Sequence, residues 1–350
     1  TSLMKTARTP IYYTRCPVPT ASGIAFQANM FENAFQGSGY EVRKIVELGP
    51  ARQDAHYTHS IDAFFREGGG SPPIWARASG AESVLLGMTF VDEMLGIFVR
   101  ADDSAMTVAE LAGRRVALPV WPRLVFNFWR FVALHAISAT LQLNGMRQED
   151  VRFIEVVEEW DPSERRNIAR GSVDAPARCE YRRQLDALLE GKVDAVFGKG
   201  YEAALLVHEA RGRIRMLSDL RDAPASTDRV RISMPRLLTT SVKFLEKHPD
   251  AVVRYLRTLV QAAHWADDNI AEASALVARE CGVAPWQQEG YVGPEFVGRF
   301  LPRITDEMLE STQFMVTFLH RHGFIPTKFA VESWLDPAPL AEALAATGTK

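Results

Sequence analysis

A cysteine near the start of the chain stands in a setting that could make its sulfur reactive. Cys16 follows the strand-like run 11–14 and Arg15, and it precedes a Pro-Val-Pro unit. The two prolines restrict the backbone beside the thiol. The N-terminal field of the helix predicted to follow favours a thiolate. A small buried hydrophobe is the alternative interpretation of Cys16.

A second group of chemically useful residues begins forty positions later. His56 is followed ten residues on by Arg66 and then by a run of glycines that includes Gly68 and Gly69. A neutral imidazole can accept a thiol proton, and a guanidinium is a forked, permanently charged donor suited to an oxyanion. Glycines let backbone N–H groups approach an anion closely. Taken alone, Arg66 could equally be a surface charge and the glycine run a flexible turn.

Metal binding and disulfide bonding are weaker interpretations of the same residue types. His56 and His59 could begin a metal site, but no third ligand of convincing spacing follows, so we predict no metal. Three cysteines in 350 residues do not make a disulfide framework. We interpret Cys179 and Cys281 as structural or incidental.

Strands and helices alternate along most of the chain, which predicts parallel sheets covered by helices, an α/β fold. Hydrophobic periodicity predicts strands at 8–16, 40–48, 82–90, 94–100, 151–157, 193–200 and 213–220. It predicts helices at 20–39, 71–80, 124–145 and 181–192, and a mostly helical region from about residue 240 to 334. Ligands of such folds bind at the carboxyl ends of strands. Cys16 lies at such an end.

Composition excludes several classes of function. A length of 350 residues predicts two domains. The formal net charge of −3 argues against a general nucleic-acid binder, and no apolar run reaches the length of a membrane span. The first ten residues lack the apolar centre of a signal peptide. We therefore expect a cytoplasmic monomer, or a periplasmic protein if a leader has been removed.

The residues named so far carry a likeness to a known family. The chain resembles the 2′-hydroxybiphenyl-2-sulfinate desulfinases of dibenzothiophene desulfurisation, which share the two-lobed fold of the nitrate, sulfonate and taurine solute-binding proteins. The matching elements are Cys-Pro-Val-Pro at 16–19, the spacing of His56, Arg66, Gly68 and Gly69, and the segments 96–104, 111–118, 193–197, 264–269 and 282–315. The likeness therefore spans nearly the whole chain.

The resemblance implies a type II periplasmic-binding-protein-like fold, in which each lobe is a largely parallel sheet flanked by helices. Lobe I would comprise residues 1–108 and 216–350 and carry the site. Lobe II would comprise residues 109–215. The chain would then cross between the lobes near residues 108 and 216.

The resemblance also implies roles for individual residues. Cys16 corresponds to the essential cysteine, His56 to its partner histidine and Arg66 to the sulfinate-binding arginine. Gly69, beside Gly68, corresponds to the glycine whose N–H helps to hold the sulfinate. The implied reaction cleaves an aryl C–S bond with water and releases sulfite, without a metal or organic cofactor. Cys16 could act as a nucleophile on sulfur or as a proton donor to carbon.

The chain also departs from the family pattern. Arg15 replaces a neutral amide and adds positive charge to the predicted substrate site, the glycine run is longer, and the 119–131 region is bulkier. These differences favour a related aryl or alkyl sulfinate over the biphenyl compound. The competing interpretation is a non-catalytic solute-binding protein of an ABC transporter for a sulfonate-like anion, which needs no reactive thiol. The pyrimidine synthases of this fold carry a cysteine-rich motif that is absent here.

Overall fold

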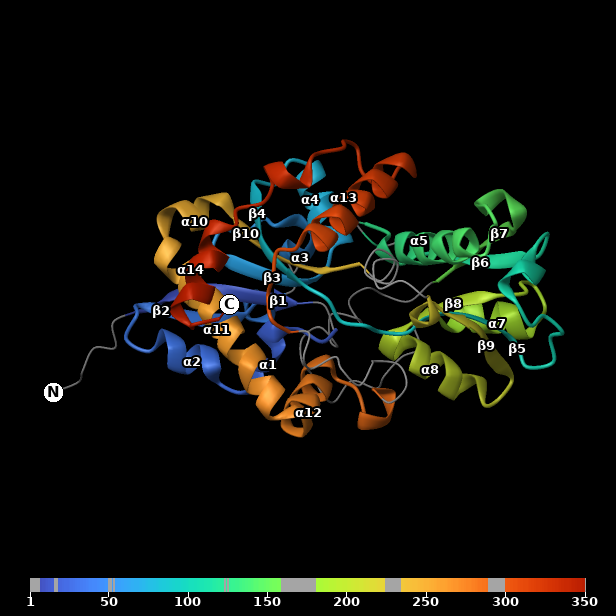
Figure 1. The fold of residues 1–350 in the computed structure, drawn as a ribbon, viewed down its shortest axis with the longest axis horizontal. Helices are drawn as coiled ribbons and strands as arrows, with labels where there is room; N and C mark the ends of the chain where they lie inside the picture. Colours follow the sequence, from blue (N-terminus) through green and yellow to red (C-terminus); the bar gives the residue numbers. More distant parts are fainter. Residues whose placement is uncertain are drawn as a thin grey trace.

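The computed structural model describes residues 7–15, 18–49, 52, 54–122, 124, 126–158, 181–223, 234–288 and 300–349. The molecule is elongated, and its strands gather in two groups placed along the long axis (Figure 1). The first and last described segments of the chain both lie in the larger group (Figure 1). Cys16 lies outside the described residues.

The larger group is built on a mixed sheet that, among the described residues, has five strands in the order β2-β1-β3-β10-β4. The strands are β1 (Thr9–Arg15), β2 (Tyr40–Lys44), β3 (Phe64–Gly69), β4 (Ser83–Thr89) and β10 (Arg236–Ser241). Strand β1 runs parallel to β2 and β3, whereas β10 runs antiparallel to β3 and β4. Strand β4 is buried along its whole length, because helices cover both faces of the sheet.

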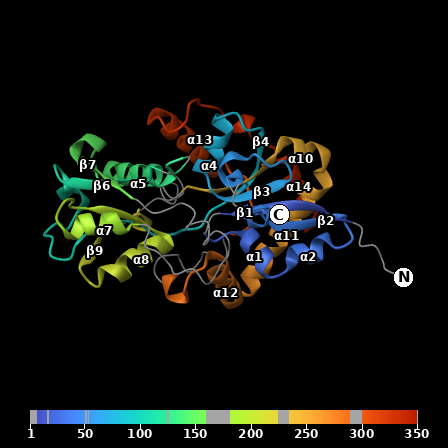
Figure 2. The ribbon, with the colours of Figure 1, turned by 180° about the vertical axis from the view of Figure 1, so that it is seen from behind.

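Helices lie on the two sides of this sheet (Figure 2). They are α1 (Ala21–Gln27), α2 (Met30–Phe35), α3 (Ala55–Thr58), α4 (Ser71–Ala78), α10 (Val242–Lys247), α11 (Pro249–Asp268), α12 (Ile270–Cys281), α13 (Asp306–Arg321) and α14 (Ala338–Ala346). One side carries α1, α2, α11 and α12, and the other carries α4 and α13 (Figure 2). Tyr255 of α11 stacks on Phe65 of β3 with ring centroids 3.7 Å apart, which fixes this helix to the sheet.

The smaller group repeats the same strand pattern. Within the described residues, β5 (Leu95–Arg100) lies between β8 (Val196–Lys199) and β9 (Ile214–Asp219) and is antiparallel to both. Strands β6 (Arg115–Val120) and β7 (Arg152–Val157) pair in parallel. A parallel bridge between Val116 and Ala195 connects β6 to the residues that lead into β8. The combined order is β7-β6-β8-β5-β9, so each sheet holds one reversed strand among parallel ones.

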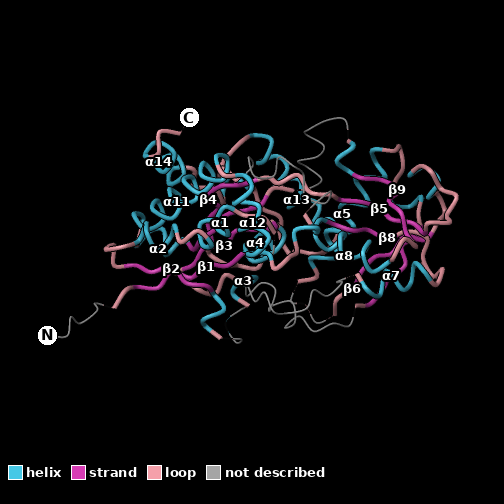
Figure 3. Tube along the Cα trace, turned by 90° about the horizontal axis from the view of Figure 1, so that it is seen from below, coloured by secondary structure: helices cyan, strands magenta, loops and turns pink. Residues whose placement is uncertain are grey.

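The helices of the smaller group are α5 (Phe128–Leu143), α7 (Arg182–Leu189) and α8 (Gly200–Ala210). Strands lie among surrounding helices in both groups (Figure 3). The predicted α/β fold with largely parallel sheets is therefore confirmed. No helix in the described part of the chain combines the length and the apolar character needed to cross a bilayer.

The division into lobes at residues 108 and 216 stays a prediction. Strand β5 precedes residue 108 but pairs with β8 and β9 of the smaller group. This pairing favours a first crossing between Thr89 and Leu95. Strand β9 likewise favours a second crossing between Asp219 and Arg236.

Two predicted elements differ from the structure. The single helix predicted over 20–39 is wrong, because the chain forms α1 and α2 with Asn29 between them in the left-handed conformation (φ 58°). Asparagine adopts this conformation more readily than other side-chain-bearing residues. The strand predicted over 40–48 ends at Lys44, and residues 45–48 form a 3₁₀ turn.

Aromatic packing joins the two groups on one side. Phe131 of α5 lies 5.9 Å from Phe318 of α13 and 5.7 Å from Phe324, measured between ring centroids. Trp75 of α4 stacks on Phe126 at 6.1 Å. One continuous hydrophobic cluster therefore extends from the α4 and α13 face of the larger sheet into the smaller group.

Buried charges connect the two groups at a second place. The Glu93 carboxylate, between β4 and β5, accepts a hydrogen bond from Arg236 at the start of β10 and forms an ion pair with Lys199 of β8 at 3.3 Å. Both Glu93 and Arg236 are 2% exposed. Burial acts to raise the pKa of Glu93, but Arg236 and Lys199 outweigh it and hold that pKa below its usual value.

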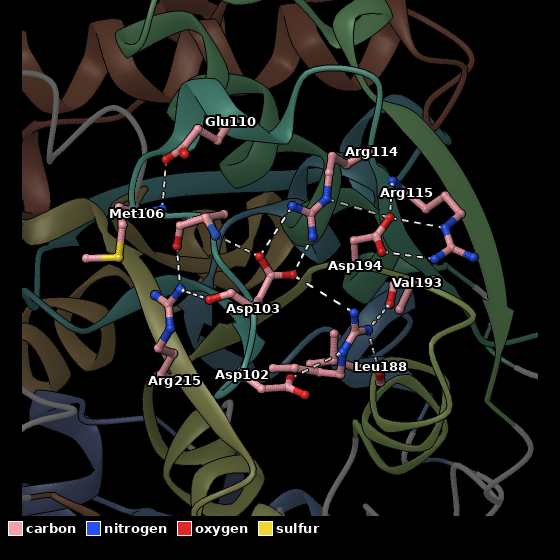
Figure 4. Close-up of polar contacts among 12 residues, drawn as sticks. Asp102, Asp103, Met106, Glu110, Arg114, Arg115, Leu188, Val193, Asp194 and Arg215 are labelled. Carbon is pink, nitrogen blue, oxygen red and sulfur yellow. Dashed lines mark hydrogen bonds and ion pairs between the residues drawn. The ribbon is translucent and has the colours of Figure 1, made fainter.

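Charged side chains also organise the far side of the smaller group (Figure 4). Asp103 pairs with Arg114, and Asp194 accepts two hydrogen bonds from the Arg115 guanidinium at 3.1 and 2.9 Å. Arg215 donates to the carbonyl oxygen of Asp103. These contacts fix the turn after β5 against the neighbouring strands.

Removal of the Glu93 charge tests how much the buried ion cluster stabilises the fold. We expect Glu93→Gln to lower the free energy of unfolding by about 3 kcal/mol, because it leaves the buried Arg236 guanidinium without its anion. Asp62→Asn is the matched control, since its pair with Lys243 is more than half exposed and therefore adds little to stability. Denaturant unfolding measures both changes. Equal losses of unfolding free energy in the two variants would contradict a stabilising role for the buried Glu93 cluster.

Candidate functional site

The candidate site lies where β1 and β3 end beside the short helix α3. Strands β1 and β3 are parallel neighbours, so their carboxyl ends meet at the same edge of the sheet. Helix α3 lies before β3 in the chain and carries His56, and β3 carries Arg66. The pairing thus brings residues from three separate segments together.

His56 is held by hydrogen bonds from both ring nitrogens. Its Nδ1 lies 2.7 Å from the hydroxyl oxygen of Thr14 in β1, and its Nε2 lies 3.4 Å from Nη2 of Arg66. A guanidinium can only donate hydrogen bonds, so Nε2 is the acceptor. In this neutral tautomer Nδ1 carries the proton and donates it to Thr14.

Arg66 is completely buried. Its Nε donates to the carbonyl oxygen of His56 at 2.9 Å, and its Nη1 donates to the carbonyl oxygen of Gly69 at 2.9 Å. These bonds fix the plane of the guanidinium between α3 and the end of β3. Because the surroundings have a low dielectric constant, the positive charge interacts strongly with any anion that reaches it.

The glycines after Arg66 differ in the room around them. A Cβ atom built on Gly69 would meet no described atom within 4 Å, whereas one on Gly70 would lie 2.9 Å from Met315 and 3.1 Å from Leu237. Gly68 pairs with Leu237 of β10 and has a φ of 154°, which few side-chain-bearing residues adopt. No described atom therefore occupies the position that a side chain at Gly69 would take, and the Gly69 carbonyl oxygen binds Arg66.

His59 lies behind Arg66 and is nine-tenths buried. Its Nε2 lies 3.0 Å from the Thr239 hydroxyl, and its Nδ1 lies 3.4 Å from the carbonyl oxygen of Tyr57. Burial and, to a lesser extent, the nearby Arg66 charge lower the pKa of His59 to about 3. His59 is therefore neutral at physiological pH and supports the site from within the protein.

An aromatic surface begins beside His56. The ring of Tyr57 meets His56 edge-on at 4.9 Å and stacks on Phe128 of α5 at 6.2 Å. Phe128 contacts Trp129, which in turn contacts Tyr181. The His56 side of the larger group thus meets aromatic residues of the smaller group.

The structure brings together some of the predicted site residues. His56, Arg66 and Gly69 lie in contact, and Gly68 lies next to them in β3. Arg15 is the last residue of β1, and nothing is described of its side chain. Because Cys16 lies outside the described residues, its predicted role stays a prediction. Among those residues, no group of three or more histidine, cysteine or acidic side chains could hold a metal ion.

Sequence reasoning missed two residues that position the site. Thr14 orients the His56 ring, and Thr239 of β10 binds His59. The strand predicted over 8–16 could have identified Thr14. Residues two apart in a strand point to the same face, so this strand would put Thr14 on the same face as Cys16. No local signal identifies Thr239, since it lies 180 residues from His59 in the sequence.

The chain is similar to known proteins over most of its length. A scan against protein-family models found no match. The chain is 26% identical to 2′-hydroxybiphenyl-2-sulfinate desulfinase of Rhodococcus erythropolis, with 96% of this chain and 94% of that protein aligned. It is also 25% identical to a putative aliphatic sulfonates-binding protein of Bacillus subtilis strain 168, over 72% of this chain and 64% of that protein. The resemblance that the sequence suggested is confirmed.

Solved structures show the same fold. A cysteine-to-serine mutant of DszB in complex with biphenyl-2-sulfinic acid aligns with a TM-score of 0.79 at 23% identity, covering 97% of this chain and 99% of that one. The aliphatic sulphonate-binding protein SsuA of Escherichia coli aligns with a TM-score of 0.63 at 17% identity, covering 95% and 92% of the two chains. The chain has the fold shared by DszB and the periplasmic sulfonate-binding proteins.

The buried His59 makes the free energy of unfolding depend on pH. Its pKa of about 3 in the folded protein lies below the ordinary value of 6.5, so between these values the unfolded chain binds more protons. This contribution is present in full above pH 6.5 and is lost as the pH falls toward 3, with a slope of about 1.4 kcal/mol per pH unit.

Unfolding of the wild type and of His59→Gln, measured from about pH 7.5 down to about pH 4.5, tests this expectation. The stability difference between the two proteins should shrink with acid, because only the wild type carries the titrating group. Glu158, whose burial raises its pKa to about 7, changes stability in the opposite direction but is present in both. If the stabilities of the two proteins changed in parallel with pH, the low pKa of His59 would be contradicted. The control is His264→Gln, on the exposed side of α11.

Proposed function

We propose that this protein is a cysteine-dependent hydrolase of the sulfinate desulfinase type. It cleaves the C–S bond of an aryl or related sulfinate and releases sulfite, with no cofactor. Cys16 is the reactive group, His56 assists proton transfer, and Arg66 with the Gly68–Gly69 backbone holds the sulfinate. Arg15 adds positive charge beside the thiol. The observation that carries the proposal is the fully buried Arg66 guanidinium, locked between His56 and Gly69.

The geometry around Arg66 supports an anionic ligand of this kind. A guanidinium with a fixed plane recognises two oxygens of one anionic group through its forked donors. Gly69, whose carbonyl oxygen binds Arg66, has no side chain that would crowd such a group, and no described atom would meet a Cβ there. The aromatic residues Tyr57 and Phe128 support an aryl substituent on the sulfinate.

The proposed reaction balances without a redox partner. A sulfinate and water give the C–H product and hydrogen sulfite. In one route the Cys16 thiolate attacks sulfur, the carbon leaves and takes a proton, and water then cleaves the S–S bond. In the other, the Cys16 thiol protonates the ring carbon, SO₂ leaves and is hydrated, and the released proton returns to the thiolate. Arg66 stabilises the sulfur-bound charge in both.

A two-lobed arrangement would suit this chemistry. With the first crossing between β4 and β5 and the second between β9 and β10, the substrate would lie between the two sheets. Closure of the lobes would exclude bulk water and strengthen the interaction between Arg66 and the sulfinate.

A non-catalytic sulfonate-binding protein is the second candidate. The similarity to an aliphatic sulfonates-binding protein over 72% of this chain favours it. Both candidates use Arg66 to hold an anion, and they differ in the need for Cys16. A thiol substitution therefore separates them.

The decisive experiment is a panel of aryl and alkyl sulfinates with sulfite release as the readout. We expect the wild type to release sulfite from at least one aryl sulfinate, and Cys16→Ser to lower kcat by about a thousandfold or more, because the hydroxyl is a far weaker nucleophile and acid. Cys281→Ser, a change at the buried thiol that ends α12, is the control. If no sulfinate is turned over while a sulfonate binds tightly, the binding-protein candidate holds instead.

Binding of a non-hydrolysable aryl sulfonate tests the role of Arg66. We expect Arg66→Lys to raise Kd about 10- to 100-fold, since a point charge cannot replace the forked donor. Arg77→Lys is the matched control, because Arg77 lies on α4 and donates to a carbonyl group outside the site. Isothermal calorimetry gives both values. An unchanged Kd for Arg66→Lys would remove Arg66 from the site.

A further inference from the structure

Glu67, the residue after Arg66 in β3, is a buried carboxylate that the reaction proposed above does not use. Its exposed fraction is 1%. Successive residues of a strand point to opposite faces, so Arg66 faces α3 and Glu67 faces α1. Arg66 and Glu67 are therefore adjacent along β3, and their side chains project from opposite faces of the sheet.

The Glu67 carboxylate holds the first turn of α1. Its Oε2 accepts the backbone N–H of Ser22 at 2.9 Å, and the backbone N–H of Ala21 also bonds to this carboxylate. The Ser22 hydroxyl lies 2.9 Å from that of Tyr255, which is itself completely buried. Glu67 thus fixes the start of α1 through groups that water does not reach.

Glu67 also lies beside the residue that precedes Cys16 in the chain. In the parallel register of β1 and β3, Arg15 is the partner of Glu67. Arg15 is the residue before Cys16, and α1 begins at Ala21. Glu67 therefore contacts the described chain on both sides of Cys16, through its pairing with Arg15 and its hydrogen bond from Ser22.

Burial of the Glu67 carboxyl group lowers the stability of the folded protein. Its Oε1 has no hydrogen-bond partner among the described residues, and a buried polar atom without a partner costs stability. Burial raises the pKa of Glu67, and the hydrogen bonds from Ser22 and Ala21 and the Arg236 charge oppose that rise. Tyr255 of α11 also faces it.

We propose that Glu67 is a positioning residue, whose buried carboxyl group fixes the start of α1 and thereby the location of the Cys16 thiol relative to Arg66. The role of Cys16 in this statement rests on the proposed function. Because Arg66 and Glu67 are neighbours in one strand, β3 positions both the guanidinium that would bind the anion and the carboxyl group that would hold the thiol in place. A displacement of the thiol by about 1 Å would lower turnover about a hundredfold.

Three variants test this role. Glu67→Ala removes the acceptor, and Glu67→Gln keeps an oxygen that can accept the Ser22 N–H. Glu280→Ala is the matched control, because Glu280 is an equally buried carboxylate that bonds Gln27 at the end of α1 and Tyr13 of β1, whereas the backbone N–H of Ser22 bonds Glu67. The readouts are kcat and KM for sulfite release, the melting temperature, and the rate at which iodoacetamide alkylates Cys16 without substrate, followed by peptide mass spectrometry.

We expect Glu67→Ala to lower kcat about 10- to 100-fold with KM changed less than about threefold, and to alter the Cys16 alkylation rate at least about threefold. Glu67→Gln should return kcat and the alkylation rate to within about threefold of the wild type. Glu280→Ala should lower the melting temperature by a similar amount while leaving kcat and alkylation nearly unchanged.

Two results would overturn the proposal. One is an unchanged alkylation rate in Glu67→Ala, and the other is an equal loss of kcat in the Glu67 and Glu280 variants at equal melting temperature. If the wild type releases no sulfite from any sulfinate, the proposed function fails. The alkylation rates then decide the positioning role on their own, because they need no turnover.

Discussion

The buried guanidinium of Arg66 is the interaction on which the candidate site depends. A positive charge inside a protein must be bonded by fixed polar groups, and here the carbonyl oxygens of His56 and Gly69 supply them. These bonds tie α3, which carries the imidazole, to the end of β3. The same contact therefore fixes the charge and orients the histidine, and in the proposed function it sets where the anion would bind.

Strand β3 organises both sides of the sheet around that contact. Arg66 points toward α3 and His56, while Glu67 points toward α1. Parallel pairing with β1 puts Thr14 beside Arg66 and Arg15 beside Glu67. A change in register by one residue would exchange the two faces, so the buried sheet itself is part of the site.

The fold alone does not separate catalysis from binding. DszB and SsuA share this architecture with the present chain, and fold does not determine function. Both proposed activities would hold an anion at the end of β3. The thiol of Cys16 is the feature that distinguishes them, because a binding protein has no use for a group that attacks or protonates its ligand.

The sequence by itself determined the α/β class, most strands, and the association of His56 with Arg66, because these follow from local periodicity and from recognisable spacing. It did not reveal the break at Asn29, where a single left-handed residue outweighs the helical pattern on either side. Nor did it show that β5 joins β8 and β9, that Thr239 contacts His59 from 180 residues away, or that Tyr255 contacts Ser22 from 233 residues away. Only the tertiary structure decided these, since contacts between distant segments depend on sheet pairing, which local sequence does not encode.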